Sequence, residues 1–155
     1  MKLYLVQHAN AKSKEEDPLR SLSNKGWEEI KKVAEYARHY LHIEANQILH
    51  SGKLRAKQTA ETLAKHLEPP KEVNSIEGLE PMANPHIMKD YLAETRKDIL
   101  VVGHLPHLSK LASLLIIQDE EKDMIAFGNA CLVCLERQTD NRWRLVWMIT
   151  PETVP

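Results

Sequence analysis

The sequence predicts a three-layer α/β/α fold with a mainly parallel sheet and an antiparallel hairpin at its C-terminal end. Short apolar runs alternate four times with segments of helical periodicity, an order typical of parallel strands joined by helical crossovers. Two extended segments, residues 129–137 and 142–149, then follow each other across a short polar turn, which indicates a hairpin. Because the chain has 155 residues, no internal repeat and no linker-like stretch, we expect residues 1–155 to form a single domain.

The first half of the chain carries clear local signals. Ser23 is a good helix N-cap, and Trp27 and Ile30 begin an apolar stripe with helical spacing. Pro69 and Pro70 end the second helical segment, because proline lacks the backbone donor that a helix needs. The expected elements are a strand over residues 2–7, a polar loop over 9–22, a helix over 23–43, a strand over 47–50 and a helix over 54–67.

The second half continues the alternation before the hairpin. Pro85 stands at a first-turn helix position, where its fixed φ is tolerated, and Pro106 opens another helix. The run over residues 99–103 is apolar throughout and is the most convincing buried strand. The expected elements are a strand over residues 71–76, a loop over 78–85, a helix over 85–95, a strand over 98–103, a helix from 106 and a polar stretch over 118–123.

Composition and charge argue against several classes of function. The net charge of −1 gives no reason to expect a nucleic-acid partner. No apolar stretch is long enough to cross a bilayer, so we expect no membrane association. The N-terminus shows no secretory signal, which predicts a cytoplasmic protein. Phosphate-binding glycine motifs of NTPases and dinucleotide enzymes are absent.

The cysteines and the closely spaced histidines do not form a metal or redox motif. Cys131 and Cys134 lie three residues apart in a strand-like segment, so their thiols should face opposite sides of the sheet. We therefore interpret both as packing residues. His104 and His107 have a spacing that a metal pair can use, but Pro106 interrupts it and no H-E-x-x-H pattern is present. No metal site is expected.

Three polar segments follow predicted strands and indicate a site. His8 follows the strand at residues 2–7, His104 follows the strand at 98–103, and Arg55 lies just beyond a third strand. Because the carboxyl ends of parallel strands meet at one edge of a sheet, we expect these side chains to lie close together. Two imidazoles and an arginine at such an edge indicate phosphoryl chemistry.

Each candidate residue has a chemical reason and an ordinary alternative. A neutral imidazole nitrogen attacks phosphorus readily near neutral pH, which makes His8 a candidate nucleophile. Phosphoryl transfer needs positive charge, which Arg55 in a first helical turn, Arg20 in the first loop and protonated His104 would supply. The alternatives are structural histidines at strand ends and arginines that only contact solvent.

The order of these motifs resembles the histidine phosphatase superfamily, and within it the small bacterial phosphohistidine phosphatases. The resemblance covers essentially the whole chain. The first helix is preceded by Arg20-Ser21-Leu22-Ser23-Asn24-Lys25-Gly26, which is similar to the loop motif of the family. The other matching motifs are Gln7-His8-Ala9 for Arg-His-Gly, Ser51-Gly52-Lys53-Leu54-Arg55-Ala56-Lys57-Gln58-Thr59 for Ser-Pro-x-x-Arg-Ala-x-Gln-Thr, and Val102-Gly103-His104-Leu105-Pro106 for the closing motif.

This resemblance implies a phosphoglycerate mutase-like fold and a phosphatase that uses no metal or organic cofactor. It implies that His8 is transiently phosphorylated, that Arg55 and Arg20 bind phosphate, and that His104 binds the transferring group. The implied activity is removal of phosphate from phosphohistidine in a protein, with a small phosphorylated compound as the other substrate class. Nothing in the sequence sets an oligomeric state.

Two departures from the family pattern keep alternatives open. Gln7 replaces the first arginine and Ala9 replaces the glycine. The Gln7 amide can still contact phosphate, but losing a charged contact in such a site costs about 3 kcal/mol if nothing compensates. The protein is then either a phosphatase, with Lys12 or Lys53 replacing the charge, or a pseudophosphatase that only binds phosphorylated ligands. A structural or partner-binding α/β domain is the third reading.

The substrate class depends on whether the site holds a carboxyl group that can protonate the leaving group. Hydrolysis of a phosphomonoester needs such a proton donor, whereas hydrolysis of phosphohistidine does not. Glu80, in the loop around residues 77–81, is the candidate donor, and a solvated loop glutamate is its alternative. The compact chain has no inserted segment to enclose a small substrate. This favours an open pocket that accepts a protein-borne phosphohistidine.

Overall fold

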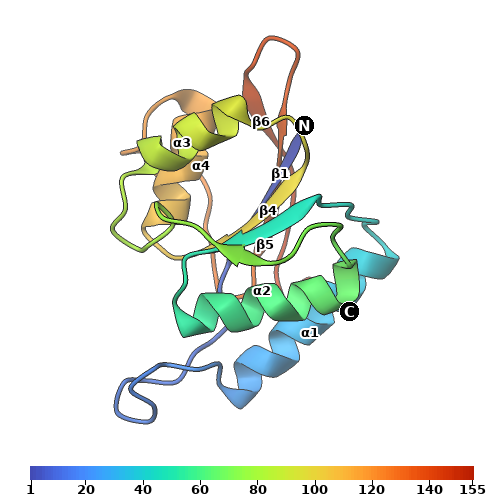
Figure 1. Cartoon of the computed structure of the whole chain (residues 1–155), viewed down its shortest axis with the longest axis vertical. Coiled ribbons are helices and arrows are strands. Elements are labelled where there is room, and N and C mark those ends of the chain that lie inside the picture. The colour runs from blue at the N-terminus through green and yellow to red at the C-terminus, as the bar shows by residue number, and fades with distance from the viewer.

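The computed structural model describes residues 1–155 as one six-stranded sheet covered by helices on both faces. Helices α1 and α2 lie on one side of the sheet, and α3 and α4 lie on the other (Figure 1). The strand order is β3-β2-β4-β1-β5-β6, parallel from β3 to β1 and antiparallel at β5 and β6. The predicted three-layer architecture with its C-terminal hairpin is confirmed. The strands are β1 (Lys2–Gln7), β2 (Gln47–His50), β3 (Asn74–Ser75), β4 (Ile99–Gly103), β5 (Leu132–Arg137) and β6 (Trp143–Ile149), and the helices are α1 (Asn24–His39), α2 (Leu54–Leu67), α3 (Pro85–Glu94) and α4 (His107–Ile117).

Several predicted elements are shorter in the structure than in the sequence analysis. Helix α1 ends at His39 instead of residue 43, and His42 beyond it takes a positive φ of 48°. Strand β3 keeps only two exposed residues, because it lies at the sheet edge and pairs with β2 alone. Strand β5 begins at Leu132 instead of residue 129, since Ala130 takes a φ of 56° and its N–H bonds to the Gln7 carbonyl.

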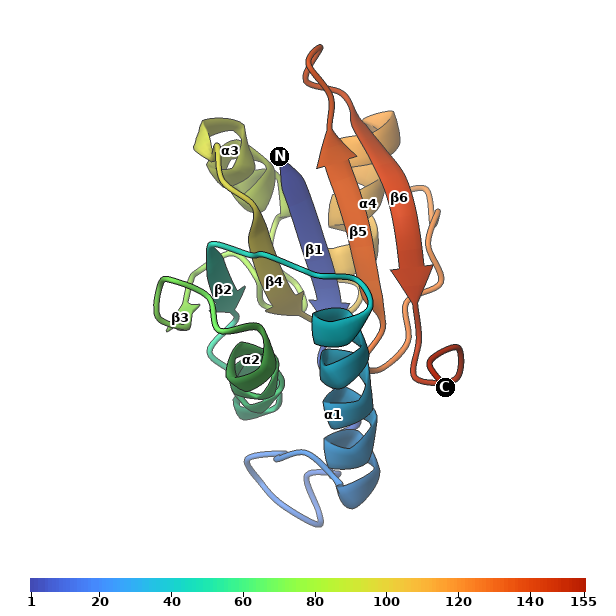
Figure 2. The ribbon, with the colours of Figure 1, turned by 90° about the vertical axis from the view of Figure 1, so that its right-hand side faces the viewer.

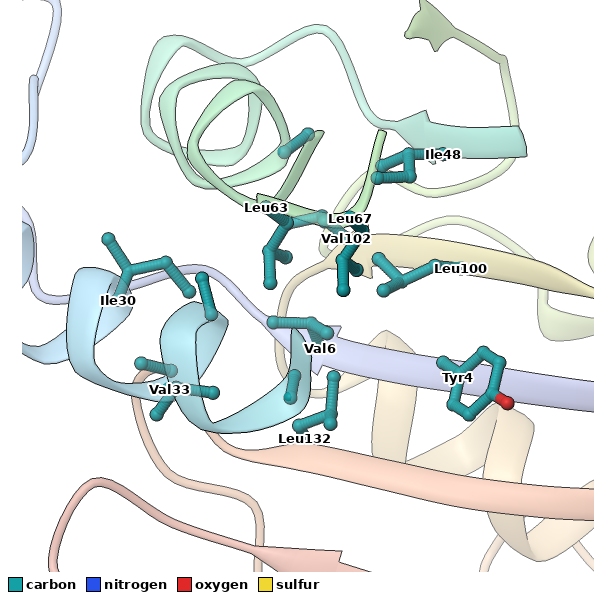
Figure 3. Close-up of a cluster of buried hydrophobic side chains, with 14 of the residues drawn as sticks. Tyr4, Val6, Ile30, Val33, Ile48, Leu63, Leu67, Leu100, Val102 and Leu132 are labelled. Atoms are coloured by element: carbon teal, nitrogen blue, oxygen red, sulfur yellow. The ribbon is translucent and has the colours of Figure 1, made fainter. Parts of the chain in front are cut away.

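Two apolar layers hold the sheet between its helices. Residues that alternate along β1 divide between them: Val6 packs toward α1 and α2, and Leu5 packs toward α3 and α4. Figure 3 shows Val6 meeting side chains of both helices on the first side. Cys131 and Cys134 are free, fully buried and belong to opposite layers, as predicted. No helix is both long and apolar enough to span a bilayer.

The register of the central strands brings three chain segments to one edge of the sheet. In the parallel pair β1 and β4, Gln7 lies opposite Gly103, and in β2 and β4 His50 lies opposite Val102. The arrowheads of these three strands point to the same end of the sheet (Figure 2). The residues that follow them in the chain therefore begin at that end.

The start of α1 fixes the long loop beside this edge. The Ser23 side chain accepts a hydrogen bond from the Gly26 N–H and donates to Asn10 Oδ1 at 2.6 Å. Helix α1 approaches the loop so closely that a Cβ on Gly26 would lie 2.0 Å from the Asn10 carbonyl oxygen. Only glycine fits this contact, so the position of the loop depends on residue 26.

We expect Gly26→Ala to lower the free energy of unfolding by about 2 kcal/mol or more, because the added methyl group overlaps the backbone of Asn10. Urea denaturation measures the change. Gly128→Ala is the matched control, since a Cβ there meets no atom within 4 Å, and we expect a change of less than about 0.5 kcal/mol. Equal stability of the two variants would contradict the close packing of α1 on the loop.

Candidate active site

Two imidazole rings lie side by side where β1 and β4 end. His8 directly follows β1 and His104 directly follows β4. Their ring centroids are 5.0 Å apart and the ring planes are inclined by 52°. Only 9% of His8 and 1% of His104 is exposed to solvent. The sequence prediction that the two strand ends bring these rings together is therefore met in the structure.

The tautomer of His8 follows from its neighbours. Its Nδ1 lies 2.7 Å from the carbonyl oxygen of Ala9, and a carbonyl can only accept a hydrogen bond. Nδ1 therefore carries the proton, and Nε2 of the neutral ring is unprotonated and can accept a hydrogen bond. Arg55 Nε donates to this Nε2 at 3.3 Å. The unprotonated nitrogen of His8 thus faces a guanidinium group.

A buried threonine holds Arg55 next to His8. Thr59 Oγ1 donates to the Arg55 carbonyl at 2.7 Å and accepts the Ala9 N–H at 3.0 Å. Thr59 is fully buried, so this bridge is shielded from water. It fastens the first turn of α2 to the chain segment that follows β1. The sequence analysis assigned Thr59 no role, although it lies in the Ala-x-Gln-Thr part of the motif.

A serine forms the side-chain hydrogen bond of the His104 ring. Ser51 Oγ lies 2.5 Å from His104 Nε2 and also accepts the Lys53 N–H at 3.4 Å. The other ring nitrogen, Nδ1, is buried without a hydrogen-bond partner. Ser51 was not among the predicted site residues. Its position directly after β2 was the signal that could have identified it.

Arg20 and Gln7 lie at the border of this group. Arg20 takes a φ of 51°, and its Nε donates to the Lys12 carbonyl at 3.0 Å. The charge of Arg20 lowers the pKa values of both His8 and Arg55, so the loop brings a second guanidinium close to the site. Gln7 Oε1 is buried and makes no hydrogen bond. The Gln7 side chain is uncharged, so this position of β1 lacks the positive charge of the arginine in the family pattern.

Comparison with solved structures identifies the fold. The protein histidine phosphatase SixA, solved with tungstate, matches with a TM-score of 0.88 at 22% identity over 100% of both chains. This chain has the SixA phosphatase fold. A candidate phosphohistidine phosphatase SixA from Agrobacterium tumefaciens matches with a TM-score of 0.76 at 24% identity over 97% of both chains. A mutant phosphoserine phosphatase from Entamoeba histolytica, solved with phosphoserine, matches with a TM-score of 0.72 at 17% identity over 99% of both chains.

The expected phosphoglycerate mutase-like fold is confirmed by these structural neighbours. No protein-family sequence model matches the chain, and no curated protein sequence matches it either. The likeness therefore lies in the fold, at 24% sequence identity or less in the structures compared.

Within this SixA fold, burial and positive charge keep both rings neutral. Burial lowers the pKa of His8 to about 4. The hydrogen bond to the Ala9 carbonyl opposes this shift in part, and the Arg55 and Arg20 charges each lower the pKa by a smaller amount. Burial lowers the pKa of His104 to about 3, helped by His8, Arg55 and Lys53. Every side-chain charge acting on these rings is cationic. The site is therefore suited to an anion.

Glu80 lies in a different environment from the one predicted for a proton donor. Its Oε2 accepts the Gly78 N–H at 2.9 Å, and it makes no hydrogen bond to His8 or His104. Its charge acts instead on His107, opposing the burial that lowers the pKa of that ring to about 4. The donor role of Glu80 stays a prediction. No three His, Cys, Asp or Glu side chains gather closely enough to hold a metal ion.

We expect the protein to lose stability as the pH falls from 6.5 toward 4. His107 is fully buried without hydrogen-bond partners, and its folded pKa lies below the unfolded value of 6.5. Folding therefore disfavours its protonated form, and this ring alone removes up to about 3 kcal/mol by pH 4. His107→Leu should flatten the decline measured by urea denaturation at several pH values. The exposed His39→Leu is the control, and an equal slope in both variants would contradict the assignment.

Proposed function

We propose that this protein is a phosphatase that works through a phosphorylated His8 intermediate. The observation that carries the proposal is the unprotonated Nε2 of a neutral His8, which accepts the Arg55 Nε–H at 3.3 Å and lies beside the ring of His104. A neutral imidazole nitrogen in a cationic site is the arrangement that attack on a phosphoryl group requires. The likeness to SixA solved with tungstate, an oxyanion, supports the same conclusion.

The reaction divides into two displacements at phosphorus. His8 Nε2 forms a bond to phosphorus while the bond from phosphorus to the leaving nitrogen breaks, and the departing group takes a proton from solvent. Water then attacks phosphorus, the Nε2–P bond breaks, and inorganic phosphate leaves. Arg55 and Arg20 stabilise the charge on the phosphate oxygens in both steps. The neutral His104 ring adds an N–H contact, and Gln7 adds an amide contact.

The substrate we infer is phosphohistidine carried by a protein. Neither His8 nor His104 forms a hydrogen bond or an ion pair with a carboxylate, so the site is best matched to a leaving group that departs without a general acid. An imidazole is such a group, whereas an alkoxide is not. The names of the structural neighbours include phosphohistidine phosphatases of the SixA type, which supports this substrate class. We propose that residues 1–155 act as one domain without a metal or organic cofactor.

A second candidate function rests on Gln7. Its side chain carries no charge, and its Oε1 is buried without a partner where the family pattern has arginine. A site weakened in this way would favour a pseudophosphatase that binds phosphorylated ligands without turning them over. Binding of tungstate without hydrolysis of any phosphohistidine substrate would support this alternative.

We expect the wild-type protein to hydrolyse a phosphohistidine peptide in the presence of a chelator. Labelled peptide, quenched in alkaline detergent, should leave a labelled protein. His8→Ala should lose the label and roughly a thousandfold or more in turnover, because the attacking nitrogen is gone. His39→Ala, a change to an exposed histidine of α1, should keep both. Turnover retained in His8→Ala would refute the proposed intermediate.

A further inference from the structure

The site has one fewer fixed cation than its motifs require. Gln7 takes the place of an arginine, so Arg55 and Arg20 are the arginines left to balance a phosphoryl group. A phosphoryl group at neutral pH carries close to two negative charges. An additional cation that reaches the same pocket would restore the balance. Two lysines, Lys12 and Lys53, lie in the segments that build the site.

The charge of Lys12 acts on other groups. Its carbonyl accepts Arg20 Nε and its N–H donates to Ser21, so its backbone supports the loop. Its charge lowers the pKa values of Glu16 and Asp17 in that loop. It is absent from the charges that act on His8 and His104. The positive charge of Lys12 therefore acts on the acidic side chains of the loop and not on the two histidine rings.

Lys53 is placed differently, at the N-terminal end of α2 and two residues before Arg55. Its backbone N–H donates to Ser51 Oγ at 3.4 Å, and the same oxygen lies 2.5 Å from His104 Nε2. Its side chain is exposed and makes no hydrogen bond or ion pair. Its charge is also one of those that act on the His104 ring. The backbone of Lys53 is therefore fixed beside the site, and its ammonium group is unpaired and acts on the His104 ring.

We propose that Lys53 is a phosphate ligand that supplies the positive charge that Gln7 does not. The proposal rests on the phosphatase function proposed above. The flexible four-carbon stem of lysine lets the ammonium turn toward phosphate oxygens from the exposed N-terminal end of α2. Lys53 and Gln7 then act as a compensating pair. An arginine at residue 7 would make the charge at residue 53 largely dispensable.

Tungstate binding, measured by calorimetry, tests the ligand role without requiring turnover. Lys53→Gln should weaken tungstate binding by about 10- to 100-fold and lower kcat/KM for a phosphohistidine peptide by a similar factor. Lys53→Arg should keep most of both. Lys57→Gln is the matched control, because Lys57 is also exposed on α2 but pairs with Glu61 at 3.9 Å. We expect less than a twofold effect from it.

A double substitution tests the compensation itself. Gln7→Arg should recover at least tenfold of the tungstate affinity lost in Lys53→Gln, while improving the wild-type protein much less. The inference fails if Lys53→Gln binds tungstate as Lys57→Gln does, if Gln7→Arg has the same effect in both backgrounds, or if the wild-type protein does not bind tungstate. Normal tungstate binding and Lys53 dependence without any turnover would instead overturn the proposed phosphatase function and leave Lys53 as an anion ligand.

Discussion

The parallel pairing of β1 with β4 in one register is the constraint on which the candidate site depends. Gln7 lies opposite Gly103, and the His8 N–H donates to the Gly103 carbonyl at 3.1 Å. The next residue of each strand leaves the sheet at the same level and on the same edge, which brings the His8 and His104 rings to 5.0 Å. A shift by one residue would turn one ring to the opposite face of the sheet. Gly103 also leaves room there, since a Cβ would press against Leu108 at 3.3 Å.

The chemistry of the site follows from burial among cations. Removing His8 from water lowers its pKa to about 4, which keeps the ring neutral and nucleophilic at physiological pH. Arg55 adds to this effect, and in the proposed function its guanidinium also binds the phosphate oxygens. The same burial makes protonation in acid costly to the fold, so nucleophile and stability depend on pH through one physical cause. The site has less positive charge to balance a phosphoryl group than the family pattern provides, because Gln7 contributes only an uncharged amide.

Much of this arrangement was predictable because it follows from local periodicity and strand ends. Helix α2 has the predicted bounds, and His8, Arg55 and His104 meet because each follows a parallel strand. The shared contacts of Ser51 and Thr59 were not predictable in the same way. They depend on how the turn after β2 and the first turns of α2 face other strand ends, and a side-chain pattern does not encode such long-range hydrogen bonds. The shortening of β3 likewise reflects its place at the sheet edge, where only one neighbour pairs with it.

The central claim is that His8, His104 and Arg55 form one anion site, and histidine NMR during a tungstate titration tests it most directly. The imidazole signals of His8 and His104 should shift together along one single-site binding curve, with the exposed His39 unchanged as the internal reference. Arg55→Gln should weaken both shifts equally. Signals of His8 and His104 that follow different curves, or only one of them moving, would show that the two rings do not share a site.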